Sequence, residues 1–426
     1  MTLHVLAWVL AGTKETGTAH RDSPGLELDT PTYGLLARHE WQVQASRLRF
    51  IDLVPYLFEL GAQVRTLPWP AGTSFEERLP AVLEAIKWAD VVQWQASNWN
   101  WVCHDCSWPR HEGSLGETRS QHLARGHRLL PSNLDLLELY SIARVTKRLA
   151  WVLDADDYFE PDPPAWLKAQ RPIVTAQHPI ELRGNPVREA DLLTVSTPRL
   201  ARVAKQYNEN VRVIRNSINP SAYVTGLPRP FGPTRLVWYG DYRRPDFLGS
   251  YCQKGIQDHR SLLTTVHVGA RTFEMNYAPW REACDFDEAR SVVGWDVFPF
   301  ALADAHPEIG VAPLAYFTGL QASCKSELHW LEYAACGAPT VAQRFRGGGP
   351  YDVIQNGVDG FLAHGRREWT DAIGRLARSP QLRADIGGAA RERVLRDYGN
   401  PRQRAEELRD AYLWAAEHAG IGRRAA

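Results

Sequence analysis

Short apolar runs alternate along the chain with longer segments in which apolar residues recur at helical spacing. In the first half, helical spacing is present at residues 48–60, 75–88 and 134–147. Strands that alternate with helices are typical of βαβ units around a parallel sheet. The first half is therefore predicted to be a Rossmann-like α/β domain, with strands at residues 5–10, 64–67, 91–94, 149–153, 192–196 and 211–214.

A segment rich in Pro and Gly, residues 220–233, separates this pattern from a second one like it and is predicted to be an interdomain linker. The second pattern predicts strands at residues 235–239, 264–268, 292–298, 309–314 and 340–343, and helices at 327–336, 351–355, 369–377, 380–397 and about 401–419. The predicted organisation is an N-terminal Rossmann-like domain over 1–225, a C-terminal one over 233–400, and a helix within 401–426 that can pack back on the first domain. Facing domains would place a ligand site between them, beyond the carboxyl ends of the strands.

The composition fits globular domains and argues against several classes of protein. The chain has 426 residues, 44% hydrophobic and 23% charged, and its 49 Lys and Arg residues balance 49 Asp and Glu residues. A chain without a charge excess has no overall electrostatic attraction to nucleic acid or to an anionic membrane. No apolar run approaches the ~20 residues that span a bilayer, so no transmembrane segment is predicted.

The N-terminus and the cysteines indicate a cellular location. Residues 1–10 are apolar but have no basic segment before them, so they are predicted to form a buried strand and not a signal peptide. Without such a signal, cysteines are expected to be thiols or metal ligands instead of disulfides. The predicted location of the protein is therefore the cytoplasm. The six cysteines are Cys103, Cys106, Cys252, Cys284, Cys324 and Cys336.

The predicted helix over residues 327–336 carries the strongest indication of chemistry. Ser326 is a good N-cap, and the exposed N–H groups and positive dipole end of a helix N-terminus suit a phosphate. Lys325 adds a full positive charge there. Glu332, about two turns along, can accept two hydrogen bonds from a vicinal diol such as a ribose. When the segment is taken alone, a capped amphipathic helix with a solvated Lys and Glu is the favoured interpretation.

Residues 324–342 resemble the donor-binding signature of family 4 type glycosyltransferases of the GT-B fold, also called glycosyl transferases group 1. The shared pattern is Leu-Glu-Tyr-Ala-Ala-Cys-Gly-Ala-Pro-Thr-Val from Leu331, with Lys325-Ser326 before the helix. The resemblance extends to the Glu-Ile-Gly-Val-Ala-Pro-Leu segment at 308–314 and to the stretch that begins at Gly349. It also covers residues 46–64 and 190–219 but not the insertion at about 97–133.

This resemblance implies an α/β fold of two facing Rossmann-like domains and a hexosyltransferase-like activity. Such an enzyme moves a sugar from a nucleoside-diphosphate sugar to an acceptor, with retention at the anomeric carbon and without a catalytic metal. Breaking the anomeric C–O bond builds negative charge on the departing diphosphate, which cationic side chains and a helix N-terminus stabilise. The implied catalytic residues are Lys254, Lys325 and Glu332, and the implied donor-binding residues are Arg243, Arg244, Lys254, Lys325, Ser326, Glu332 and Gly349.

Two positions depart from the family pattern. An acidic residue usually stands ahead of the helical Glu with seven residues between them, and Cys324 takes that place here. The Gly-Arg that usually ends the first strand of the C-terminal domain reads Gly240-Asp241. Arg243 or Arg244, close behind, can supply the missing guanidinium. These departures leave diphosphate binding as a firmer expectation than the recognition of any one sugar.

Candidate acceptor-side residues lie in the first half of the chain. Asp154, Asp156 and Asp157 follow the strand predicted at 149–153, where they either orient an acceptor hydroxyl or bond the loop backbone and cap the next turn. His178 is either an acceptor-side residue or a buried, satisfied histidine. Gly12, after the first strand, completes this group of candidates.

The insertion carries a pattern of metal ligands. Cys103 and Cys106 form a C-x-x-C pair, and His122 and His127 follow after a gap of 15 residues. This order and spacing are close to those of Cys₂His₂ zinc sites, so a structural zinc is predicted. The alternative is a flexible, acceptor-facing loop in which the Cys and His residues are incidental.

The sequence leaves the acceptor open. A glycan, a lipid-linked sugar, a protein or a small metabolite can each accept the sugar. A nucleic-acid-modifying glycosyltransferase is an alternative, in which the finger-like insertion holds DNA or RNA by its Arg and Trp residues. A second alternative is an inactive scaffold that only binds the sugar nucleotide, and Cys324 in an acidic position is its main support.

Overall fold

A computed structural model describes the protein over residues 3–8, 48–66, 80, 83–84, 86–95, 102–103, 129–130, 149–156, 190–225, 227, 231–240, 250–269, 286–291, 298–314 and 319–421. The chain divides into two compact units. The N-terminal unit comprises residues 1–215 and 402–426, and the C-terminal unit comprises residues 216–401. The division falls between Arg215 and Asn216, ahead of the Pro- and Gly-rich segment at 220–233.

The described strands of the N-terminal unit form a parallel sheet in the order β2-β1-β3-β6-β7-β8. These strands are β1 Leu3–Trp8, β2 Ala62–Thr66, β3 Val91–Gln95, β6 Ala150–Ala155, β7 Leu192–Val195 and β8 Val211–Val213. The first five residues of β6 are buried, which suits a strand covered on both faces. The helices of this unit include η3 Ile51–Leu53, α2 Val54–Glu59, α9 Pro198–Ala204 and α17 Pro401–His418.

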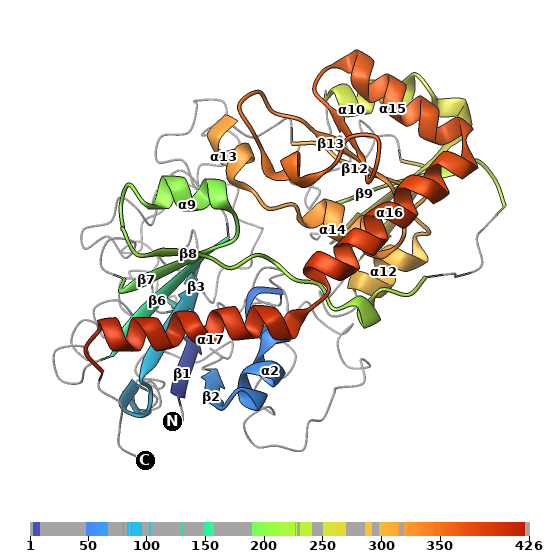
Figure 1. Ribbon diagram of the computed structural model, residues 1–426. Coiled ribbons are helices and arrows are strands. Elements are labelled where there is room, and N and C mark those ends of the chain that lie inside the picture. The colour runs from blue at the N-terminus through green and yellow to red at the C-terminus, as the bar shows by residue number, and fades with distance from the viewer. Residues whose placement is uncertain are drawn as a thin grey trace. The chain divides into compact units, whose positions relative to one another are not determined.

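The helix α17 returns from the C-terminal unit and packs on the sheet of the N-terminal unit (Figure 1). Its Ala405, Leu408 and Ala415 belong to the same buried apolar cluster as residues of β1, β3 and β6. The hydroxyl of Tyr412 donates to Oε1 of Gln93 on β3. The buried side of α17 therefore completes the core of the N-terminal unit, although α17 is far in sequence from the strands of that unit.

The described strands of the C-terminal unit form a second parallel sheet in the order β11-β10-β9-β12-β13-β14. Counted from the start of the unit this is the order 3-2-1-4-5-6, the Rossmann order. The strand order reverses between β9 and β12, which makes that position the topological switch point. The strands are β9 Thr234–Tyr239, β10 Leu263–Gly269, β11 Glu288–Ser291, β12 Ile309–Ala312, β13 Thr340–Gln343 and β14 Phe361–Ala363.

Helices cover both faces of this sheet. The period of two in a strand places Val237 and Tyr239 in a cluster with α14, and Leu236 and Trp238 in another with α10 and α15. A Cβ at Gly310 on β12 would lie 2.3 Å from the ring of Tyr333, so glycine there lets α14 approach the sheet closely. The helices of the unit include η4 Pro220–Ala222, α10 Tyr251–Gln257, η5 Arg260–Leu262, α12 Phe298–Asp304, α13 Gly319–Cys324, α14 Leu328–Ala335, η6 Pro350–Val353, α15 Arg366–Arg378 and α16 Pro380–Tyr398.

Two predicted elements differ from the structure. The strand predicted at 292–298 is wrong at its end, because Phe298 begins α12, and residues 292–297 lie outside the described residues. The helix predicted at 351–355 is a 3-10 helix of four residues, η6, stopped by the turn that follows. A short antiparallel pair, β4 Val102–Cys103 with β5 Leu129–Leu130, lies within the insertion.

Candidate functional site

The candidate site lies at the carboxyl ends of β9 and β12, where open α/β sheets bind ligands. The strand β9 ends at Tyr239 and leaves the sheet through Gly240, whose φ of 156° lies in a region that favours glycine. A Cβ at Gly240 would also lie 3.2 Å from the indole of Trp238. The sequence therefore needs glycine at this exit from the sheet.

The helix α14 faces this end of the sheet and departs from its predicted start. Glu327, not Ser326, is its N-cap, and no side chain caps it. The hydroxyl of Ser326 instead accepts a hydrogen bond of 3.0 Å from Nδ2 of Asn216. Residues 330–335 are all buried, so the helix is enclosed on nearly every side and not along a single stripe.

Glu332 is fully buried in α14, which rules out the solvated carboxylate considered above. Its Oε1 accepts a hydrogen bond of 2.9 Å from the hydroxyl of Tyr223, and its Oε2 accepts one from the hydroxyl of Tyr239. Burial and the adjacent Glu332 charge raise the pKa of Tyr239 well above its usual range, so Tyr239 keeps its proton for this bond. The carboxylate is thus held in one orientation by two tyrosines.

His329 lies one turn before Glu332 and is only half-buried. Its ring stacks on Tyr239, with ring centroids 4.2 Å apart and planes 13° from parallel. Its Nε2 lies 3.2 Å from the carbonyl oxygen of Tyr239. Because a carbonyl oxygen only accepts, Nε2 carries the hydrogen of this contact.

The predicted cationic residues occupy different settings. Lys254 is exposed and is the fourth residue of α10. Ser250 caps that helix by accepting from the backbone N–H of Gln253 at 3.1 Å. Its Nζ lies 5.9 Å from the ring centroid of Tyr251. Lys325 is 9% exposed and sits between α13 and α14. The alternative of an amphipathic helix requires a solvated Lys325, and this burial limits the contact of Lys325 with water.

Two further positions of the donor signature are described. Gly349 is the N-cap of η6, and its backbone N–H donates to Oδ2 of Asp352 at 2.9 Å. A Cβ there would lie 2.6 Å from the ring of Phe345, so packing requires glycine. Cys324, in the position of the family's acidic residue, is a buried cysteine outside any disulfide, at the end of α13.

The acceptor-side candidate Asp154 is buried in an ion pair with Arg49. The guanidinium donates from Nε to Oδ2 at 2.7 Å and from an Nη to Oδ1 at 2.5 Å. Thr194 adds a hydrogen bond of 2.6 Å to Oδ1. Asp154 therefore links β6 to β7 and to the segment of Arg49, a role that neither of the predicted alternatives included. Asp156 is half-buried, and its carbonyl oxygen accepts from Ser196 at 2.9 Å.

The remaining predicted site residues lie outside the described part of the chain. They are Gly12, Cys106, His122, His127, Asp157, His178, Arg243 and Arg244, and of Cys103 only the backbone in β4 is described. Within the described ranges, no group of three or more His, Cys, Asp or Glu side chains is arranged to hold a metal. The zinc site consequently stays a prediction. Among the helices described, none is long and apolar enough to cross a membrane.

Sequence reasoning missed three of the residues that meet here, namely Tyr223, Tyr239 and His329. A signal for His329 is its spacing from Glu332, because residues three apart share a helix face. Tyr239 was the last residue of a predicted strand before a glycine, which is a typical place for a site residue. Nothing in the sequence pattern connected Tyr223 to this group.

Comparisons with known proteins bear on the same region. Residues 317–410, which contain α14, match a protein family described as glycosyl transferase-like. A D-inositol 3-phosphate glycosyltransferase from Saccharomonospora viridis is 40% identical over 68 residues. That match spans 16% of this chain and 15% of the relative.

Solved structures match almost the whole chain. HepE from Anabaena, in complex with UDP and glucose, superposes with a TM-score of 0.57 at 13% identity and covers 97% of this chain and 100% of its own. Sucrose-phosphate synthase from Thermosynechococcus elongatus gives a TM-score of 0.57 at 14% identity, with 97% and 100% covered. These likenesses establish the fold, and the resemblance to GT-B glycosyltransferases is confirmed. The chain therefore has the GT-B fold of glycosyltransferases, and its C-terminal half contains a glycosyl transferase-like region at residues 317–410.

Proposed function

We propose that the protein is a glycosyltransferase that moves a sugar from a nucleoside-diphosphate sugar to an acceptor. The observation that carries this proposal is the position of α14, whose glycosyl transferase-like sequence faces the switch point of a Rossmann-ordered sheet. Such a switch point is the usual binding place of a nucleotide. HepE, which shares the fold, was solved with UDP and glucose.

The donor diphosphate is assigned to the cationic side chains of the C-terminal unit. Lys254 on α10, Lys325 before α14, and Arg243 or Arg244 supply positive charge, and Ser326 and Gly349 complete the donor-binding group. As the anomeric C–O bond breaks, these groups stabilise the charge that develops on the leaving diphosphate. The acceptor oxygen bonds to the anomeric carbon on the face that the diphosphate leaves, and the leaving phosphate takes the acceptor proton. The proposed mechanism therefore retains the anomeric configuration and needs neither an enzyme base nor a catalytic metal.

The acceptor side is assigned to the N-terminal unit, with Gly12, Asp156, Asp157 and His178 as its candidates. Asp154 is assigned a structural role because its carboxylate already accepts three hydrogen bonds from Arg49 and Thr194. The acceptor class is a glycan, a lipid-linked sugar, a protein or a small metabolite.

The insertion at 97–133 is assigned a structural zinc held by Cys103, Cys106, His122 and His127. Metal analysis of protein purified without added zinc should give about one zinc per chain, as for a closed four-ligand site. The Cys103→Ser/Cys106→Ser double variant should lose that zinc. If the double variant retained the metal, the ligand assignment would be wrong.

A nucleotide screen tests the proposed function. Thermal unfolding is measured with UDP, GDP, ADP and inorganic diphosphate, and the sugar nucleotide that corresponds to the best ligand is then incubated without acceptor. We expect one nucleoside diphosphate to raise the unfolding temperature and its sugar nucleotide to be slowly hydrolysed. Binding without any turnover would support the inactive scaffold instead, and no nucleotide binding would exclude both.

A further inference from the structure

The carbonyl group of Gly240, where the chain leaves β9, is held in a cradle formed by the end of β10. Nε2 of His267 lies 3.1 Å from the carbonyl oxygen of Gly240, and it carries the hydrogen of this bond because a carbonyl oxygen only accepts. A Cβ at Gly269 would lie 2.1 Å from the same oxygen, so glycine leaves the space that the carbonyl occupies. The backbone N–H of Gly240 donates to the carbonyl of Val268 at 3.1 Å. The strand β10 therefore holds Gly240 at both its nitrogen and its oxygen.

His267 is a polar residue in an apolar setting. It is 0% exposed within β10, and its neighbours in the strand are buried valines. Its ring packs against Trp238 and Phe286, with ring centroids 4.9 and 5.6 Å away. Burying an imidazole costs free energy unless its N–H is bonded, so an apolar side chain would fill this space at a lower cost. The property that an apolar side chain lacks is the hydrogen bond to Gly240.

The cradle lies beside the place where a Rossmann-ordered sheet binds phosphate groups. The strand β9 is the first strand of the order 3-2-1-4-5-6, and the loop after the first strand is the usual position of a phosphate in such sheets. The segment that follows Gly240 carries Arg243 and Arg244 in the sequence and leads to Ser250, the N-cap of α10. The direction in which the chain leaves Gly240 sets where this segment begins.

We propose that His267 is a positioning residue for the donor site, which holds the carbonyl of Gly240 and thereby fixes the start of the segment that carries Arg243 and Arg244. His267 is buried and does not itself touch the donor. Without its hydrogen bond, the glycine backbone regains freedom, and the segment after it must be ordered when the ligand binds, which lowers affinity. This inference rests on the proposed function and adds to it a residue of β10 that acts through the backbone of Gly240.

Two variants of His267 separate positioning from packing, because they are expected to rank affinity and stability in opposite orders. His267→Leu fills a similar space with apolar atoms but has no N–H for Gly240. His267→Gln fills a similar space and keeps a side-chain N–H that can reach the carbonyl. A positioning role predicts tighter diphosphate binding by the Gln variant, although the Leu variant is the more stable protein. A packing role predicts that affinity is constant or follows stability.

Dissociation constants for UDP or GDP and for inorganic diphosphate are measured by calorimetry on the full-length wild type and both variants, with unfolding temperatures from the same samples. We expect His267→Leu to weaken both ligands by about tenfold, as for the loss of one hydrogen bond, and His267→Gln to recover most of that loss. Wild-type affinity in His267→Leu, or weaker binding by the Gln variant than by the Leu variant, would overturn the inference. If the wild type bound none of these ligands, the proposed function itself would be wrong, and this role of His267 with it.

The same strand offers a matched control and a second test of the cradle. Thr265 is also buried and lies two residues earlier on the same face of β10, where its hydroxyl donates to Asp287 at 3.0 Å. We expect Thr265→Val to lower the unfolding temperature and to leave diphosphate affinity unchanged. Gly269→Ala places a Cβ where the Gly240 carbonyl lies, so it should weaken diphosphate binding as His267→Leu does. Equal affinities for Thr265→Val and Gly269→Ala would contradict the positioning role.

Discussion

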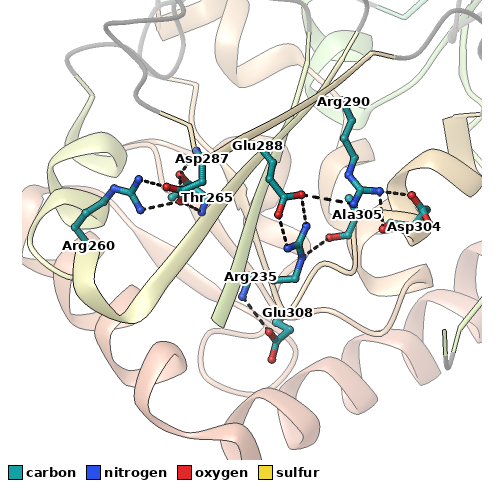
Figure 2. Close-up of polar contacts among 9 residues, drawn as sticks. All are labelled: Arg235, Arg260, Thr265, Asp287, Glu288, Arg290, Asp304, Ala305 and Glu308. Atoms are coloured by element: carbon teal, nitrogen blue, oxygen red, sulfur yellow. Dashed lines mark hydrogen bonds and ion pairs between the residues drawn. The ribbon is translucent and has the colours of Figure 1, made fainter. Parts of the chain in front are cut away.

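The two ends of the sheet in the C-terminal unit are built from different chemistry. At the amino ends, charged side chains pair with one another: Arg235 binds Glu288 with two hydrogen bonds of 2.8 Å, and Arg260 binds Asp287 with bonds of 2.5 and 2.8 Å (Figure 2). At the carboxyl ends, the hydroxyls of Tyr223 and Tyr239 hold one buried carboxylate, Glu332, and the imidazole of His329 stacks on Tyr239. Paired charges at the amino ends bind each other, whereas at the carboxyl ends the buried carboxylate is held by neutral tyrosine hydroxyls.

The amino-end network ties together elements that are distant in sequence. Arg235 on β9 also donates to the carbonyl of Ala305 at 2.9 Å, and its backbone N–H donates to Glu308 at 2.9 Å. Arg383 on α16 donates to the other oxygen of Glu308 at 2.9 Å and to the carbonyl of Leu376, near the end of α15, at 2.7 Å. Arg290 binds Asp304 at the end of α12 (Figure 2). This end of the sheet therefore holds strands and helices together.

The largest expected effect concerns Asp154. This carboxylate lies near the carboxyl end of a strand, where ligands usually bind, but it forms a buried ion pair instead. Asp154, at the end of β6, is 3% exposed and pairs with the equally buried Arg49. Asp154→Asn leaves the guanidinium without its charge partner, which costs about 3–5 kcal/mol in comparable buried pairs. Chemical denaturation measures this loss, and nucleotide affinity should be unchanged. A variant of normal stability that failed only in sugar transfer would return Asp154 to the acceptor site.

The next effect separates the two ends of the sheet directly. Arg235→Met removes a nearly buried guanidinium that holds Glu288 and Ala305. Because Glu288 is 39% exposed and can be hydrated, we expect a loss of about 2–3 kcal/mol, below the range for a fully buried pair. Denaturation and calorimetry on the same sample should show lower stability and an unchanged nucleotide dissociation constant. A change in affinity as large as the change in stability would show that the two ends are not independent.

The exposed Lys254 should show the reverse behaviour. Lys254→Ala is expected to weaken diphosphate binding by about 1–3 kcal/mol, as for a charge-assisted hydrogen bond, and to leave stability nearly unchanged. Lys205→Ala is the matched control, because Lys205 is also exposed but lies in the N-terminal unit. Calorimetry with inorganic diphosphate measures both variants. Equal affinities for the two would remove Lys254 from the donor site.

The smallest expected effect is a pH dependence at the amino end. Hydrogen bonds from Arg260 lower the pKa of Asp287 to about 2 from its usual 3.8. A depressed folded-state pKa stabilises the protein above the unfolded value, and this contribution is lost as the pH falls from about 4 through about 2. The pair is about a third exposed, so solvent screening limits the effect to well under about 1 kcal/mol. Asp287→Asn should flatten that part of the acid unfolding curve, and an unchanged slope would contradict the assignment.

The sequence predicted the repeating α/β pattern well because parallel strands buried on both faces give continuous apolar runs. Residues 235–239 and 340–343 coincide with β9 and β13 almost to the residue. The strand predicted at 292–298 is wrong at its last residue because Phe298 faces the core from a helix, and a short apolar run does not distinguish a strand from a buried helix start.

The candidate site was predictable in its location but not in its contacts. The segment 324–342 identified α14 and Glu332 without indicating which side chains would meet the carboxylate. Tyr223 and Tyr239 lie more than 90 positions from Glu332 in the chain, so their convergence depends on strand order, which local patterns do not encode. The residue type of Ser326 predicts an N-cap, but its hydroxyl accepts a hydrogen bond from the side-chain amide of Asn216 instead.

Hydrogen exchange of the full-length protein with and without a nucleoside diphosphate tests the central claim most directly. With saturating UDP or GDP, whichever binds, backbone amides at residues 250–257 and 325–332 should become protected, because α10 and α14 border the proposed donor site. Amides at residues 260–265 and 286–290, at the amino ends of the sheet, should exchange at the same rate in both samples. Protection at the amino ends with none in α14 would contradict a donor site at the carboxyl ends of β9 and β12.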